Sequence, residues 1–142
     1  MIVDKRMQKI FLSGSVALIV LMLSSAWQKG PTVDLKASME RGKNNYVIYC
    51  MSCHMEQGEG LEGVYPPLAK SDYLMADKKR SIVQTIKGVT GEIKVNGKVY
   101  NGEMSGFDLS DAEISDMLNY IRNSFGNKGG VITPAEVKAA RK

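Results

Sequence analysis

Hydrophobic residues recur at three- and four-residue steps in several stretches of the chain, the spacing that places them on one face of an α-helix. The predicted helices cover residues 34–49, 78–87 and 110–125, with a further short helix that opens at Thr133. The segment Ser110-Asp-Ala-Glu113 has the form of a capping box, in which the two outer side chains satisfy free N–H groups at a helix start. These segments indicate a mainly helical fold.

Two other patterns separate the helices. Residues 54–70 contain three glycines and two prolines, a density that predicts a loop. Residues 92–100 alternate between apolar and polar on both sides of Asn96-Gly97, the strongest short-range signal for a β-hairpin. The predicted fold class is therefore all-α, with one small β-hairpin near 92–100.

The N-terminal residues have the pattern of an exported chain. Three basic residues before position 10 precede an apolar run over 10–23, and small residues follow at 24–26. This order is typical of a cleavable signal peptide. An uncleaved hydrophobic helix over 10–27, at the lower end of the length that spans a bilayer, fits the same residues. Both interpretations put the rest of the chain in the periplasm or at the outer face of the cytoplasmic membrane, soluble after cleavage or anchored.

Length and charge limit what the exported part can be. The chain has 142 residues, enough for one small domain and a targeting segment. We predict a signal peptide or membrane anchor with a linker at 1–33, one domain at 34–127, and a C-terminal tail with a short helix at 128–142. The formal net charge is +4, much of it ahead of the predicted domain, which argues against a nucleic-acid partner.

The candidate chemistry lies in Cys50-Met-Ser-Cys53-His54. This is the C-x-x-C-H sequence by which c-type haem is attached. Two thiols three residues apart can form thioethers with the two vinyl groups of one porphyrin, and the adjacent histidine can then bind the iron. His54 is the single histidine of the chain.

Three other interpretations of the cysteine pair are weaker. A thioredoxin-like redox pair needs a βαβ pattern, which the sequence lacks. A zinc site needs four ligands, and the chain has no second cysteine or histidine pair. A structural disulfide is compatible with export, because extracytoplasmic compartments are oxidising.

Over roughly residues 36–126 the chain resembles the class I c-type monohaem cytochromes. Gly42 and Tyr46 match positions of the family's N-terminal helix that interlock with an aromatic residue of its C-terminal helix, here Tyr120. The loop, the hairpin and Asn101-Gly-Glu-Met104 are most similar to the cytochrome c domain fused to some copper nitrite reductases, and to related small respiratory cytochromes. The resemblance implies a cytochrome c fold with one covalent haem c.

The resemblance also implies the surroundings of the iron. In Tyr65-Pro66-Pro67-Leu68, the carbonyl of Pro66 would accept the Nδ1 proton of His54 and fix its ring. Met104 stands where the family has its methionine ligand, in a Gly-rich loop expected between the hairpin and the last helix. Met75 is a second candidate for this ligand. The family commonly has proline after the methionine, whereas this chain has Ser105.

A haem iron with histidine and methionine ligands has no open site for a substrate. The expected function is therefore that of an electron-transfer protein, not an enzyme, working between respiratory complexes. Expected partners are a quinol-oxidising complex and a terminal oxidase or nitrogen-oxide reductase. The alternative is a fixed subunit of a larger membrane complex, and a less favoured one is a haem peroxidase or nitrite reductase with an open iron site.

Overall fold

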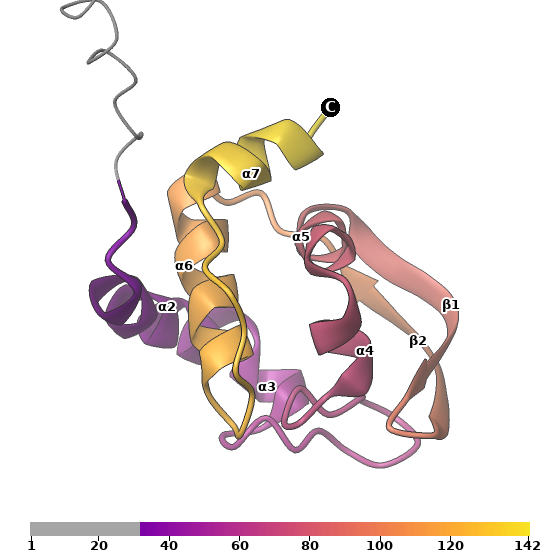
Figure 1. Ribbon diagram of the computed structural model, residues 1–142. Helices are drawn as coiled ribbons and strands as arrows, with labels where there is room; N and C mark the ends of the chain where they lie inside the picture. Colours follow the sequence, from indigo (N-terminus) through magenta and orange to yellow (C-terminus); the bar gives the residue numbers. More distant parts are fainter. Residues whose placement is uncertain (1–31) are drawn as a thin grey trace, which may run out of the picture. The chain divides into compact units, whose positions relative to one another are not determined.

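A computed structural model describes residues 32–142, so the predicted signal peptide or N-terminal hydrophobic helix lies outside the described residues. The helices and strands, in chain order, are α2 (Leu35–Tyr49), α3 (Met51–His54), α4 (Asp72–Ala76), α5 (Lys78–Lys87), β1 (Gly88–Val95), β2 (Lys98–Ser105), α6 (Asp111–Asn123) and α7 (Pro134–Ala140). Figure 1 shows α4, α5 and the hairpin on one side of α6, and α2 crossing α6. The predicted helical fold with one hairpin is confirmed for this part of the chain. None of its helices is long and apolar enough to cross a membrane.

Helices α2 and α6 interlock at Gly42. A Cβ atom at this position would lie 1.9 Å from the carbonyl oxygen of Asp116, so only glycine allows the two backbones to approach this closely. One turn further along α2, the ring of Tyr46 packs 5.5 Å from that of Tyr120 and 5.2 Å from that of Phe125, measured between centroids. The predicted interlock of Gly42 and Tyr46 with Tyr120 is confirmed.

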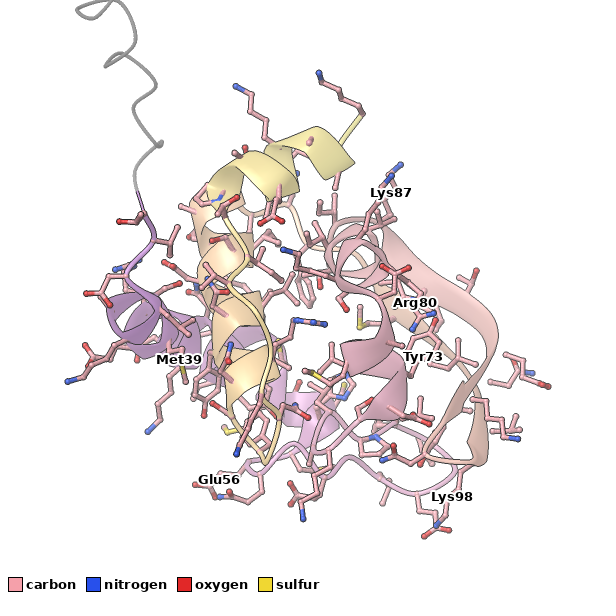
Figure 2. The ribbon with its side chains drawn as sticks, viewed as in Figure 1. Met39, Glu56, Tyr73, Arg80, Lys87 and Lys98 are labelled. Carbon is pink, nitrogen blue, oxygen red and sulfur yellow. The ribbon has the colours of Figure 1, made fainter. Side chains whose placement is uncertain are left out.

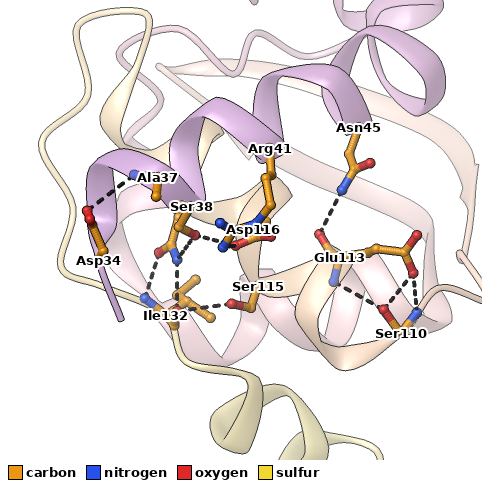
Figure 3. A network of polar contacts seen from close by, with 11 residues as sticks. Asp34, Ala37, Ser38, Arg41, Asn45, Ser110, Glu113, Ser115, Asp116 and Ile132 are labelled. Carbon is orange, nitrogen blue, oxygen red and sulfur yellow. Dashed lines mark hydrogen bonds and ion pairs between the residues drawn. The ribbon is translucent and has the colours of Figure 1, made fainter. Parts of the chain in front are cut away.

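A buried polar network joins the same two helices to the segment that follows α6 (Figure 3). The carboxylate of Asp116 accepts hydrogen bonds from Ser38 Oγ at 2.5 Å and from Arg41 Nε at 2.6 Å. Asn119 donates to Ser38 Oγ and to the carbonyl of Ile132, and its Oδ1 accepts from the Ile132 N–H at 2.7 Å. The side chain of Asn119 thereby satisfies backbone groups of a segment that has no regular structure of its own.

The segment after α6 contributes buried side chains to the core. Ile132 and Val137 are fully buried, and both belong to the same hydrophobic cluster as Tyr46 and Leu118. The short helix predicted after Thr133 is confirmed as α7, with a capping box formed by Thr133 and Glu136. Figure 1 shows α7 lying across the end of α6.

Helix α5 has the predicted limits, from Lys78 to Lys87. Asp77 caps it by accepting a hydrogen bond from the Arg80 N–H, and Gly88, with φ of +86°, ends it. Helix α4 was not predicted, because a five-residue helix is too short to show a hydrophobic period. The rest of 54–70 beyond α3 forms turns and loops, as predicted.

The hairpin has the predicted turn but longer strands. Asn96 and Gly97 both have positive φ, as a type I′ turn requires. The strands extend to Gly88 and Ser105, well beyond the predicted 92–100. The prediction that Met104 lies in a loop after the hairpin is therefore wrong, since Met104 pairs with Val89 inside the β-ladder. The glycines of this stretch suggested a loop, but the backbone ladder continues through them.

The turn of the hairpin is attached to the start of α4. The N–H of Asp72 donates to Asn96 Oδ1 at 3.0 Å, and the N–H of Asn96 donates to Asp72 Oδ1 at 2.7 Å. This reciprocal pair fixes the far end of β1 and β2 to the helical part of the domain.

Candidate functional site

Cys50, Cys53 and His54 lie at the junction of α2 and α3. Cys50 follows the last residue of α2, and Cys53 and His54 are the last two residues of α3, a single helical turn that begins directly after Cys50. No disulfide joins Cys50 to Cys53. Burial, and then the neighbouring Cys53, raises the pKa of the Cys50 thiol to about 12. The Cys50 thiol therefore lacks the lowered pKa on which redox dithiols of the thioredoxin kind depend.

The imidazole of His54 is buried and oriented by one backbone group. Its Nδ1 lies 2.9 Å from the carbonyl oxygen of Pro66. Burial lowers the pKa of His54, and the hydrogen bond to Pro66 partly opposes that shift. A neutral ring with Nδ1 as donor leaves Nε2 free as a ligand for a metal.

The loop that contains Pro66 folds back onto α3 and is hydrogen-bonded to it. Gly60 donates its N–H to the carbonyl of His54 at 3.0 Å, and its φ is +65°. A Cβ atom at Gly60 would lie 2.4 Å from the carbonyl oxygen of Tyr65, so this return of the chain requires glycine. The hydroxyl of Tyr46 donates to the carbonyl of Met55 at 2.5 Å and ties the loop to α2. These contacts determine the position of the Pro66 carbonyl.

A cavity of about 590 Å³ opens beside His54. Its lining includes Cys50, Cys53, His54, Pro66 and Met104, the five residues predicted as the site. Most of its surface is apolar and comes from the loop, α4, α6 and the hairpin. Residues of this apolar lining include Leu68, Leu74, Val95, Leu118 and Ile121.

One stretch of the cavity wall is polar, and the sequence analysis missed it. Tyr73 accepts a hydrogen bond at its hydroxyl from Gln84 Nε2 at 2.7 Å. Ser81 and Thr85, one turn apart on α5, also line the cavity. Figure 2 shows Arg80 beside Tyr73, and its guanidinium carbon lies 3.8 Å from the centre of the tyrosine ring. The available signal was the pair of small polar residues, Ser81 and Thr85, at i and i+4 on the face of α5 that is buried.

The methionines differ in their relation to the cavity. Met104 lines it from β2, and Met117 lines it from α6, with its sulfur 3.4 Å from Cys50 Sγ. Met75 is not part of the lining and packs against the hydrophobic core from α4. Met117 is almost fully buried and belongs to the hydrophobic core cluster.

This cavity fits a haem group. Haem has two apolar faces and carries two carboxylates on one edge, and the cavity has apolar walls with one polar stretch. Its volume is within the range of roughly 300–1,000 Å³ typical of cofactor sites. Two thiols, an imidazole and a thioether are the side chains by which c-type haem is attached and its iron ligated.

Comparison with known proteins identifies the family. The family model for cytochrome c matches residues 39–125, more than half of the chain. The chain belongs to the cytochrome c family. As in that family, this cytochrome carries covalently bound haem c with its iron, and its chemistry is electron transfer.

Individual relatives support the same assignment. Cytochrome c-552 of Thermus thermophilus is 37% identical over 102 residues, which cover 65% of this chain and 78% of that protein. The cytochrome c subunit of the quinone alcohol dehydrogenase of Gluconacetobacter polyoxogenes is 33% identical over 70% of this chain, but the match covers 22% of that subunit. Subunit FixP of a cbb3-type cytochrome c oxidase from Azorhizobium caulinodans is 31% identical over 94% of this chain and 44% of that subunit.

Proposed function

We propose that this cytochrome carries electrons between respiratory complexes, with Cys50 and Cys53 as the covalent attachment points and His54 and Met104 as the axial ligands of the iron. The observation that carries the proposal is that one cavity is lined by both thiols, by the imidazole and by the thioether. Pro66 has a supporting role: its carbonyl orients His54 through Nδ1 and makes the imidazole a stronger ligand.

This ligand set suits a carrier because both axial positions are filled by the protein. The bound haem supplies the one-electron chemistry. The chain binds the group, orients its ligands and excludes water with the apolar side chains of the cavity. A thioether ligand and an apolar surrounding both favour the reduced iron, so they raise the reduction potential.

The covalent attachment is tested by extraction with acidified acetone. The colour should stay with the wild-type protein and be absent from a variant in which Cys50 and Cys53 are both replaced by alanine. Single replacements are the matched controls, since each retains one thioether. Colour that extracts freely from the wild type would contradict the attachment.

The less favoured alternative, a haem enzyme, requires an open iron site. A carrier should bind carbon monoxide poorly when reduced and should turn over neither peroxide nor nitrite, because Met104 occupies the sixth position. Rapid carbon monoxide binding together with turnover of either substrate would favour the enzyme.

A fixed subunit of a larger oxidase or reductase is the second candidate. The similarity to the oxidase subunit FixP favours it, because that match spans 94% of this chain. The partners proposed are a quinol-oxidising complex and a terminal oxidase or nitrogen-oxide reductase, at the outer face of the cytoplasmic membrane or in the periplasm. The proposed anchor at residues 10–27 would keep the cytochrome on the membrane.

Two measurements separate the candidates. Sequencing the N-terminus of the mature protein shows whether residues 10–27 are removed. Purification from detergent-solubilised membranes then shows whether the cytochrome elutes alone or with oxidase or reductase subunits in fixed ratio. A free carrier predicts elution alone, and a subunit predicts a stable complex.

A further inference from the structure

Two glycines face each other in the middle of the hairpin. Gly91 of β1 pairs directly with Gly102 of β2, and both line the haem cavity. The pairs on either side, Val89 with Met104 and Ile93 with Tyr100, also line it. The cavity side of the hairpin therefore has a gap without side chains, and this gap directly precedes Met104 on the same face of β2.

The backbone conformation and the neighbouring atoms require glycine at only one of these two positions. Gly91 has φ of +87°, a conformation that L-residues rarely adopt. Gly102 has no positive φ, and a Cβ atom there would meet only the carbonyl oxygen of Val64, at an ordinary contact distance of 3.7 Å. Neither the backbone nor the neighbours of Gly102 require glycine.

Glycine inside a strand weakens the strand, because glycine loses more conformational entropy on folding than other residues do and has no side chain that can pack. A glycine in such a position often marks the close approach of a ligand to the backbone. Gly102 lies against the cavity that fits haem, and its exposed surface faces a space that the rest of the chain does not fill.

We propose that Gly102 is a positioning residue, at which the haem packs directly against the backbone of β2, so that Met104 can reach the iron. This proposal rests on the proposed ligation by Met104. Haem is rigid, and it would be attached through Cys50, Cys53 and His54, which lie in α3 and at its N-cap, so a side chain at position 102 would move the hairpin and not the haem. Residues two apart in a strand move together, so Met104 would be drawn away from the iron.

The test uses the haem-loaded protein and compares Gly102→Ala, Gly102→Val and Glu92→Val. Glu92 lies next to Gly91, is exposed and is not part of the cavity lining, so its variant adds the same side chain to the outer face of the hairpin. The readouts are the weak sulfur-to-iron charge-transfer band of the oxidised protein and carbon monoxide binding by the reduced protein. The surface charge of Glu92 affects neither.

Gly102→Val should keep its covalent haem, lose the charge-transfer band and bind carbon monoxide rapidly. Gly102→Ala adds a smaller side chain than Gly102→Val and disturbs folding less. It should lose the band at a lower temperature than the wild type. Glu92→Val should match the wild type in both readouts. An unchanged band in Gly102→Val, or an unchanged temperature of band loss in Gly102→Ala, would overturn the role of Gly102. A wild type without the band would overturn the ligation by Met104 and this proposal with it, before any variant is made.

Discussion

Gly42 lies against the backbone of Asp116 so closely that a methyl group at its Cβ position would be 1.9 Å from the Asp116 carbonyl oxygen. The same methyl group would be 2.9 Å from the Cβ atom of Tyr120. One neighbour is backbone and the other is a Cβ atom of α6, and neither can turn aside as a side-chain end can, so the overlap can be relieved only by separating the helices. Because α2 leads directly into Cys50, this crossing also determines where the haem-attachment turn begins.

Gly42→Ala should therefore lower the free energy of unfolding of the haem-loaded protein by about 3 kcal/mol or more, as overpacked core positions do. Guanidinium denaturation measures it. Gly130→Ala is the matched control, because nothing lies within 4 Å of a Cβ atom at Gly130. The control should be neutral or stabilising by up to about 1 kcal/mol. Equal effects of the two substitutions would contradict the close crossing.

Asn119→Ala should destabilise the protein by about 3 kcal/mol. The substitution leaves the N–H of fully buried Ile132 without its partner, and an unsatisfied buried group costs about 1–3 kcal/mol, while the Ile132 carbonyl keeps only the bond from Ser115 Oγ. Hydrogen exchange should rise in residues 128–140, which Asn119 ties to α6. Arg41→Ala removes a largely exposed partner of Asp116, whose carboxylate keeps the bond from Ser38 Oγ, so it should cost less than Asn119→Ala. A larger loss in Arg41→Ala than in Asn119→Ala would contradict this ranking.

The two capping boxes predict part of the acid sensitivity. Hydrogen bonds from the side chain and N–H of Ser110 lower the pKa of Glu113. Burial raises the pKa of Glu136, but bonds from Lys78 and Thr133 outweigh it and the pKa is lowered. A carboxylate with a lowered pKa in the folded state stabilises at neutral pH, and this contribution is lost as the pH falls below the ordinary value of 4.5.

The stability of the double variant Glu113→Gln, Glu136→Gln should consequently approach that of the wild type as the pH falls from neutral to below 4.5. Denaturation at a series of pH values gives the two curves. A constant difference between them across that range would show that neither carboxylate titrates with folding.

Asn96→Gly should loosen the hairpin without breaking its turn. Glycine accepts the positive φ of this position but lacks the side-chain oxygen that binds the Asp72 N–H. Loss of this bond should cost about 1 kcal/mol, and amide exchange at the end of β1 should accelerate. Lys98→Ala removes an exposed ion pair with Glu62 nearby and should change stability less than Asn96→Gly does. Exchange rates unchanged in Asn96→Gly would contradict the attachment to α4.

The parts of the fold that the sequence predicted are those with a local cause. A hydrophobic period and the stop at Gly88 indicated the limits of α5, and Asn96-Gly97 indicated the turn of the hairpin. The Cys50–His54 motif could be found because its chemistry depends on spacing within a single helical turn.

Features determined by distant contacts could not be predicted in the same way. The length of the hairpin depends on cross-strand pairing through Gly91 and Gly102, residues whose local preference is for a loop. The packing of Ile132 into the core depends on Asn119, which has no signal of its own in the chain. The polar wall of the cavity exists because α4 brings Tyr73 to Gln84, and α4 is too short to show a period.

Met104 decides between a carrier and an open haem enzyme, so the spectrum of the oxidised protein is the most direct test. The wild type should show the sulfur-to-iron charge-transfer band and its reduced form should resist carbon monoxide. Met104→Ala should lose the band, bind carbon monoxide and have a lower potential. Met75→Ala should keep the band and lose only about 2 kcal/mol of packing. A band that persists in Met104→Ala, or a wild type that lacks it and binds carbon monoxide rapidly, would contradict the account.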